Sequence, residues 1–183
     1  MNTPTSRFGL AASVMAAMIA GGCSTHTAAE QPTAAVPECA RPGLEPNQAT
    51  VDRCSAASVL SAAITTIFRY SPREQADQRV AFHSARELMT PGFAQQGEHS
   101  ALVWAPITVA QWQRWRADGI EIAAAVRLTR DDHPPDTATT AHRVLAVQLQ
   151  PSDQTSIGFA VYARATRATT TAAWLLAGLE VIA

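Results

Sequence analysis

The chain has 183 residues, of which 47% are hydrophobic and 16% charged, and its formal net charge at pH 7 is −1. This composition is typical of a globular protein. Proteins that bind nucleic acids carry a strong excess of basic over acidic residues. This chain has no such excess, with 14 basic and 15 acidic residues. We therefore expect no nucleic-acid partner.

The N-terminal 22 residues have the layout of a secretory signal peptide. Arg7 is followed by the apolar run "FGLAASVMAAMIA", residues 8–20. A helix that spans a bilayer needs about 20 apolar residues, so this run is too short to remain as an anchor. We predict that residues 1–22 are a signal peptide that is removed.

The predicted cleavage site lies next to a cysteine. Ala20-Gly21-Gly22 before Cys23 resembles the lipobox of bacterial lipoproteins, in which the cysteine is acylated and becomes the mature N-terminus. The resemblance is incomplete, because the third residue before the cysteine is usually Leu, Val or Ile. Ordinary secretory cleavage, which would release a soluble secreted protein, is the alternative. We favour lipidation of Cys23, which implies a palmitate-bearing membrane lipoprotein on the extracytoplasmic face of the cell membrane.

Two further cysteines follow Cys23. An exported protein with three cysteines needs a role for the odd thiol, and acylation of Cys23 leaves Cys39 and Cys54 as one pair. An oxidising compartment permits a disulfide bond between them, and two free thiols are the alternative. No histidine lies near either cysteine in the sequence, so we expect no metal site here.

The segment 23–51 is rich in Thr, Ala, Gln and Pro. It lacks the apolar residues needed to build a core, so it is interpreted as a tether that follows the lipidated cysteine. Residues 52–183, about 130 in number, have the usual size of one globular domain.

Helical periodicity dominates the first half of this domain. Apolar residues recur every three or four positions within "CSAASVLSAAITTIFRY". Ser71-Pro72-Arg73-Glu74 is a capping box that predicts a second helix to about Met89, followed by a short turn around Phe93. A weaker capping box at Thr108 predicts a short helix that ends at Gly119.

After Gly119 the apolar residues alternate with polar ones, as in a strand with one buried face. We predict strands at about 120–128, 143–150, 157–166 and 173–182, joined by loops rich in turn residues. Helices followed by a meander, with no βαβ alternation, predict an α+β fold in which N-terminal helices pack on a curved antiparallel sheet.

These patterns resemble a known superfamily. The segments "FRYSPREQADQRVAFHSARELMTPGFA", "WQRWRADGIEIAAAV" and "AAWLLAGLEVI" look like small exported actinobacterial-type lipoproteins of the cystatin-like, nuclear-transport-factor-like superfamily. Envelope members include assembly factors of conjugative transfer and secretion. The resemblance implies a cone of helices and sheet, and no functional residue is transferred from it, because this fold serves both enzymes and scaffolds.

Carboxylates and imidazoles gather in one predicted loop. A metal site is one interpretation, but the residues do not have the fixed spacing of ligands on a helix or strand, and Pro134-Pro135 favours a hairpin loop. The residues in question are Asp131, Asp132, His133, Asp136 and His142. We expect the loop, and we expect no metal and no cofactor.

A pocket at the mouth of the cone would have to use Tyr70, Asp77, His83, Trp112 and Trp115. Asp77 and His83 are six positions apart on one predicted helix, so their side chains point in different directions and do not form an acid–base pair. The two tryptophans could form a ligand platform, but core packing is the more common role of such residues. Trp104 and Trp174 are also assigned to the core.

Arginines lie on the predicted strands as well. Arg127, Arg164 and Arg167 could mark a binding face on the sheet, and a solvated strand face is the interpretation that we favour. The chain has no nucleophile elbow and no activated cysteine. We therefore expect a lipid-anchored, non-catalytic envelope protein that binds a protein partner beside a transfer, secretion or transport machine. An enzyme or a small-ligand carrier that uses the cavity of the cone is the alternative.

Overall fold

The computed structural model describes residues 38–40 and 51–182, all of which belong to the unit 35–183. Four antiparallel strands form one sheet in the order β1-β2-β3-β4, which confirms the predicted meander. The strands are β1 (Ile122–Leu128), β2 (Thr140–Pro151), β3 (Ile157–Thr166) and β4 (Leu175–Ile182).

The sheet buries one face, which we call the inner face. On β3, Phe159, Val161 and Ala163 are buried, whereas Tyr162 and Arg164 between them are exposed. Successive side chains of a strand point to opposite sides, so this alternation separates an inner face that meets the core from an outer face.

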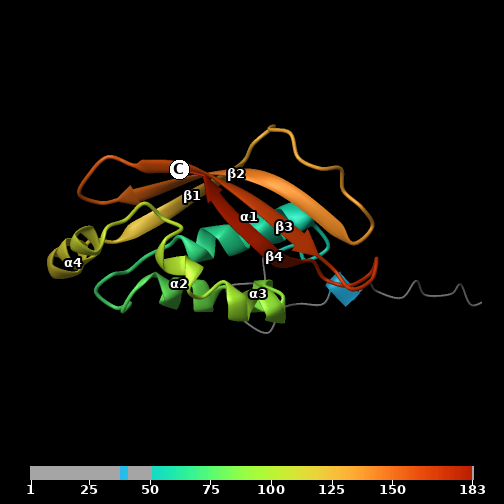
Figure 1. Ribbon diagram of the computed structural model, residues 1–183, viewed down its shortest axis with the longest axis horizontal. Helices are drawn as coiled ribbons and strands as arrows, with labels where there is room; N and C mark the ends of the chain where they lie inside the picture. The colour runs from blue at the N-terminus through green and yellow to red at the C-terminus, as the bar shows by residue number, and fades with distance from the viewer. Residues whose placement is uncertain (1–37, 41–50, 183) are drawn as a thin grey trace, which may run out of the picture. The chain divides into compact units, whose positions relative to one another are not determined.

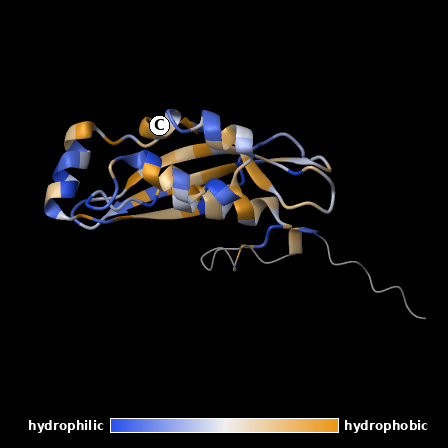
Figure 2. Cartoon of the chain, turned by 90° about the horizontal axis from the view of Figure 1, so that it is seen from below, coloured by the Kyte–Doolittle hydropathy of each residue, from blue (hydrophilic) through white to orange (hydrophobic). Residues whose placement is uncertain are grey.

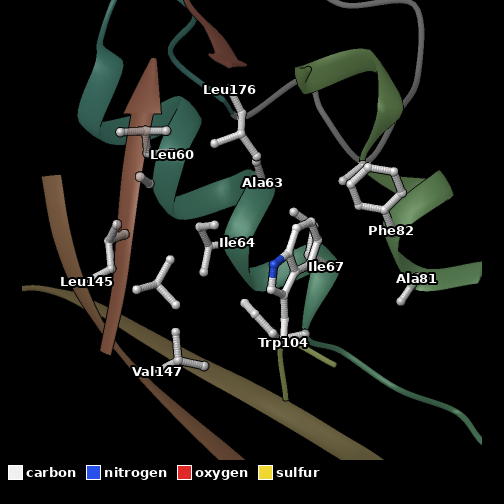
Figure 3. Packing of buried hydrophobic residues seen from close by; sticks show 14 of the residues in the cluster. Leu60, Ala63, Ile64, Ile67, Ala81, Phe82, Trp104, Leu145, Val147 and Leu176 are labelled. Carbon is white, nitrogen blue, oxygen red and sulfur yellow. The ribbon is translucent and has the colours of Figure 1, made fainter. Parts of the chain in front are cut away.

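Helix α1 (Ala56–Ile67) covers the inner face. Ser55 caps it by accepting a hydrogen bond from the backbone N–H of Ser58, and the buried side chains recur at helical spacing. Figure 3 shows Leu60 and Ile64 of α1 directed towards Leu145 and Val147 of the sheet. Burial of this apolar surface is the main contribution to stability, at about 25 cal/mol per Å².

The second predicted helix is wrong in its extent. The helix α2 spans only Gln78–Ser84, and a 3₁₀ turn, η3 (Arg86–Leu88), follows it. The guanidinium of Arg116 donates to the carbonyl oxygens of Pro72, Gln75 and Ala76, which a longer helix would need as its own acceptors. The capping-box segment 71–74 therefore forms a turn, and Asp77 caps the real helix.

The segment after η3 is more helical than its sequence predicts. In place of a turn around Phe93 it forms α3 (Pro91–Gln96), which begins with the Thr90 cap and a proline at the first position, and then the 3₁₀ turn η4 (Ser100–Leu102). Thr90 donates its N–H to the carbonyl of Leu176, so this segment is attached to the start of β4. Figure 1 shows α2 and α3 together on one side of the molecule.

Helix α4 (Val109–Asp118) has both predicted ends. Thr108 accepts a hydrogen bond from the N–H of Gln111, and Gly119 ends the helix in the left-handed region at φ 68°. Glycine adopts this conformation without the steric cost that a Cβ atom imposes. Trp112 and Trp115 are the buried residues of this helix.

The 3₁₀ turn η1 (Glu38–Ala40) is joined to the domain at two points. Cys39 and Cys54 form a disulfide bond with 5.0 Å between their Cα atoms, which is the pairing expected from the sequence. The N–H of Cys39 also donates to the carbonyl of Thr171 at 3.0 Å. Within the described residues, no helix combines the length and hydrophobicity that crossing a bilayer requires.

Candidate functional site

The three aromatic residues of the predicted pocket belong to the core. Tyr70, Trp112 and Trp115 are 1%, 4% and 0% exposed, and the rings of Tyr70 and Trp112 meet edge to face at 5.5 Å between centroids. Burial raises the pKa of the Tyr70 hydroxyl far above its ordinary value. A phenol held neutral in this way is a poor general base, and the rings fill the space that a ligand platform would need.

Asp77 is occupied by its neighbour Arg79. Its carboxylate accepts a hydrogen bond from the N–H of Arg79 at 2.9 Å and pairs with the guanidinium of the same residue at 2.6 Å. The side-chain hydrogen bond from Arg79 holds the pKa of Asp77 below its ordinary value. The carboxylate is therefore ionised at neutral pH, in a role that caps α2.

His83 has partners at both ring nitrogens. Its Nε2 lies 3.1 Å from a carboxylate oxygen of Glu98, and its Nδ1 lies 3.0 Å from the guanidinium of Arg86. No hydrogen bond joins His83 to Asp77, although both stand at α2. The structure thus divides the five residues of the predicted pocket between the core and two separate surface contacts.

The loop between β1 and β2 carries the cluster of carboxylates and imidazoles. Asp136 forms a bidentate ion pair with Arg143, with both N···O distances at 2.7 Å, and the hydrogen bond from Arg143 lowers the pKa of Asp136. The Nδ1 of His133 lies 2.9 Å from the carbonyl oxygen of Pro134. Among the described residues, no group of three such side chains is placed to hold a metal ion.

A cavity of about 310 Å³ opens on the outer face of the sheet, beside this loop. Its wall is loop segment 132–134, and its floor comprises residues 142–143 of β2, 162–164 of β3 and 178–180 of β4. In Figure 1 the loop arches on the side of the sheet away from α2 and α3. We call this cavity the outer-face pocket.

The irregular pairing of β3 with β4 shapes the floor. The register shifts between Arg164 and Ala165, and Gly178 lies opposite Arg164. The side chain of Arg164 lies against Gly178, and its guanidinium donates to the carbonyl oxygen of Ala177 at 3.1 Å. A β-bulge with a glycine commonly redirects a side chain in this way.

Two contacts fix the loop over the pocket. The Arg143–Asp136 ion pair joins it to β2, and the Nε of Arg167 donates to the carbonyl of Ala138 at 2.8 Å while its guanidinium stacks 4.4 Å from the ring centroid of Trp174. Trp174 is buried, as expected, but it precedes β4. Arg167 therefore has a structural role.

One buried polar atom in the pocket lacks a partner. The Nδ1 of His142 is inaccessible to solvent and forms no hydrogen bond with any described residue. In the register of β2 and β3, His142 lies opposite Arg164. A buried nitrogen without a partner costs free energy.

Sequence reasoning did not find the outer-face pocket. It assigned Arg164 to a solvated strand face and the region 131–136 to a hairpin loop, and both residue groups do lie at the surface. The signal available was Gly178 inside a predicted strand, because an isolated glycine there often marks a bulge or a close approach. That signal alone does not say which side chains converge.

Figure 2, which colours the chain by hydropathy, shows hydrophobic residues along the strands. On the outer face of the sheet, the small exposed residues Ala123 and Ala125 lie opposite the exposed residues Gln150 and Gln148. Tyr162 and Ile182 are larger exposed residues of the same face, at 43% and 51%. The outer face therefore combines exposed apolar residues, polar residues among them, and the outer-face pocket.

Comparison with known proteins gives little further guidance. No protein-family model matches the chain, and no curated protein is significantly similar to it in sequence. Among solved structures it is similar to CagV, a VirB8 homolog of the T4SS from Helicobacter pylori strain 26695, with 11% identity and a TM-score of 0.38 over 68% of this chain and 96% of that one. At this level of similarity, the α+β assignment depends on the chain's own helices and strands.

Proposed function

We propose that this chain is a lipid-anchored, non-catalytic envelope protein that acts as an interaction domain beside a transfer, secretion or transport machine. Cys23, the proposed lipidation site, lies outside the described residues. The proposal therefore combines the sequence pattern around Cys23 with the geometry of the described domain.

The non-catalytic part of the proposal rests on three aromatic side chains that are buried between the helices and the sheet. Tyr70, Trp112 and Trp115 occupy the position where an enzyme of this architecture would need a cavity, and each is buried. Asp77 and His83, the side chains best suited to proton transfer, are paired with Arg79 and Glu98. A general acid or base must be free to reach a substrate, so these contacts favour binding over chemistry.

The outer face of the sheet supports the proposal that the domain binds a partner protein. Tyr162 and Ile182 are large hydrophobic residues that are 43% and 51% exposed there. Tyrosine is also among the residues enriched at protein interfaces. An envelope protein partner is the occupant that this face supports best.

The Cys39–Cys54 disulfide supports an extracytoplasmic location. Such bonds persist in oxidising compartments and are rare in the cytosol. The bond joins Cys39, which lies within the proposed tether 23–51, to Cys54 at the start of the domain, 15 residues along the chain. It would keep this part of the tether attached to the domain when the lipid and the partner pull on opposite ends.

The test is fractionation of cells that express the full chain, together with cross-linking in intact cells. The wild type should be in the membrane fraction and cross-linked to another envelope protein, whereas Cys23→Ser should be released from the membrane and lose that cross-link. Retention of Cys23→Ser in the membrane, or wild type recovered only as a soluble protein with an unmodified N-terminus, would contradict the proposal.

A small-ligand carrier is the second candidate, and the outer-face pocket favours it. Its volume of about 310 Å³ is at the lower end of the range for small-molecule sites. Native mass spectrometry of the protein purified from its own host decides between the two: a carrier retains a defined small molecule, and an interaction domain does not.

A further inference from the structure

The outer-face pocket contains an anion-binding arrangement that the fold does not use. The guanidinium of Arg164 is positioned by its hydrogen bond to the carbonyl of Ala177, and among the described residues no carboxylate oxygen lies within 4 Å of it. Arg143, the other guanidinium in the pocket, is paired with Asp136. Arg164 therefore keeps donors available for a ligand.

His142 lies beside Arg164 and lines the same pocket. The two residues are opposite each other in the register of β2 and β3. A carboxylate in the pocket would accept a charge-assisted hydrogen bond from the guanidinium of Arg164.

The rest of the pocket limits what can accompany that carboxylate. The ring of Tyr162 and the ring of Pro134 give an apolar surface, and Glu180 stands two residues along β4 from Gly178, about 7 Å away along the strand. Asp132 adds a second negative charge in the loop. The ligand should therefore carry one carboxylate at the Arg164 end, an apolar body, and an N–H donor towards Glu180.

A polypeptide segment provides all three groups at this spacing. An Asp or Glu side chain supplies the carboxylate, a neighbouring apolar side chain covers Tyr162, and the backbone supplies the N–H. The volume of about 310 Å³ suits a short extended segment and is too small for a helix, whose diameter with side chains is about 10–12 Å.

The geometry points to a specific recognition site: we infer that the outer-face pocket binds an acidic residue next to an apolar residue in an extended segment of the partner protein. Arg164 holds the carboxylate, and Tyr162 contacts the apolar neighbour. This inference rests on the proposed function, because it names what the interaction domain recognises.

The experiment uses the full ¹⁵N-labelled chain in detergent micelles and three probes. They are N-acetyl-Phe-Glu-amide, its neutral match N-acetyl-Phe-Gln-amide, and the free acid 3-phenylpropionate. The Glu peptide should shift the amide signals of 132–134, 142–143, 162–164 and 178–180, with a Kd on the order of 1 mM. The Gln peptide should bind about tenfold more weakly, because the charge-assisted hydrogen bonds are lost.

Arg164→Gln should reduce binding of the Glu peptide to the level of the Gln peptide. Arg127→Gln is the matched control, because Arg127 is an exposed arginine of β1 outside the pocket. This variant should keep the preference for the Glu peptide over the Gln peptide within about twofold of the wild-type value. The amide spectrum of each variant establishes that it is folded.

Equal binding of the Glu and Gln peptides to the wild type, or signal shifts confined to another surface, would overturn the carboxylate site. Binding of 3-phenylpropionate with no binding of either peptide would overturn the polypeptide as its source. These results are independent of the proposed function: if Cys23→Ser stays in the membrane while the Glu preference holds, the anchoring proposal fails and the pocket inference stands.

Discussion

At the scale of single residues, Tyr70 is buried in the helical half, and Asp77 and His83 are paired with Arg79 and Glu98. The hydroxyl of Tyr70 is enclosed by the core, and burial raises its pKa. The raised folded-state pKa contributes stability that is present below the unfolded value of about 10 and is lost as the pH rises through the folded value.

Tyr70 therefore should not ionise while the protein is folded. The chain has two tyrosines, so Tyr162→Phe leaves Tyr70 as the only one. In an alkaline titration of this variant, tyrosinate absorbance should rise only together with the loss of structure seen by circular dichroism. A rise at about pH 10 in the folded protein would show that Tyr70 is accessible to solvent.

The stability that Asp136 contributes depends on pH in the opposite direction to that of Tyr70. The hydrogen bond from Arg143 lowers its pKa, so the pair contributes stability that is present above the unfolded pKa of about 3.9 and is lost as the pH falls through the folded value. Because the Arg143 and Asp136 side chains are 21% and 42% exposed, solvent screens the pair and its contribution is at most about 1 kcal/mol.

Asp136→Asn should therefore be slightly less stable than the wild type at pH 7, with a difference that shrinks below about pH 4. Urea unfolding of the two proteins at a series of pH values measures this. A difference that is constant from neutral to acidic pH would mean that the charge of Asp136 does not stabilise the fold.

At the scale of elements, the ends of helices were predictable where one residue decides them. Gly119 ends α4 because it adopts φ 68°, and the Thr108 cap starts the same helix. The strands were predictable because their alternation reflects a sheet with one buried face. Local sequence carries both kinds of information.

The second helix was not predictable in its extent, because a distant residue decides it. The Ser71 capping box was a valid local signal, but Arg116 of α4 binds the carbonyls that a helix from Pro72 would use. The outer-face pocket was missed for a similar reason. Its side chains come from one loop and three strands, and their convergence depends on the β3–β4 bulge.

Gly119→Ala tests the left-handed end of α4. A Cβ atom at φ 68° is strained, and it would lie 2.6 Å from the guanidinium of Arg73, so we expect a loss of about 1–2 kcal/mol in the free energy of unfolding. Gly92→Ala is the matched control, because no atom lies within 4 Å of the added Cβ, and it should be neutral or stabilising by up to about 1 kcal/mol. Equal effects of the two changes would contradict this account of Gly119.

The Cys39–Cys54 disulfide joins η1 to the segment just before α1. Replacing both Cys39 and Cys54 with Ser should lower the free energy of unfolding by about 3 kcal/mol, as expected for a loop of this length. Wild-type protein in a reducing agent should match the double variant. If both cysteines of freshly exported protein react with an alkylating agent under non-reducing conditions, the bond is absent in the cell.

At the scale of the whole molecule, the protein combines a proposed lipid at Cys23, buried aromatic residues between helices and sheet, and an exposed outer sheet face. The burial is a property of the described residues, whereas anchoring is a proposal from the sequence. In combination they predict that position in the envelope matters for function and that proton-transfer chemistry does not.

The most direct test of this central claim is complementation of a deletion strain in the organism that encodes the protein. Asp77→Asn keeps a side chain that can cap α2 and removes the carboxylate, and His83→Gln removes the imidazole. The double variant should restore the phenotype as fully as the wild type, whereas Cys23→Ser, expressed at the same level, should fail. Failure of the double variant with normal stability and membrane attachment, or full rescue by Cys23→Ser, would contradict the account.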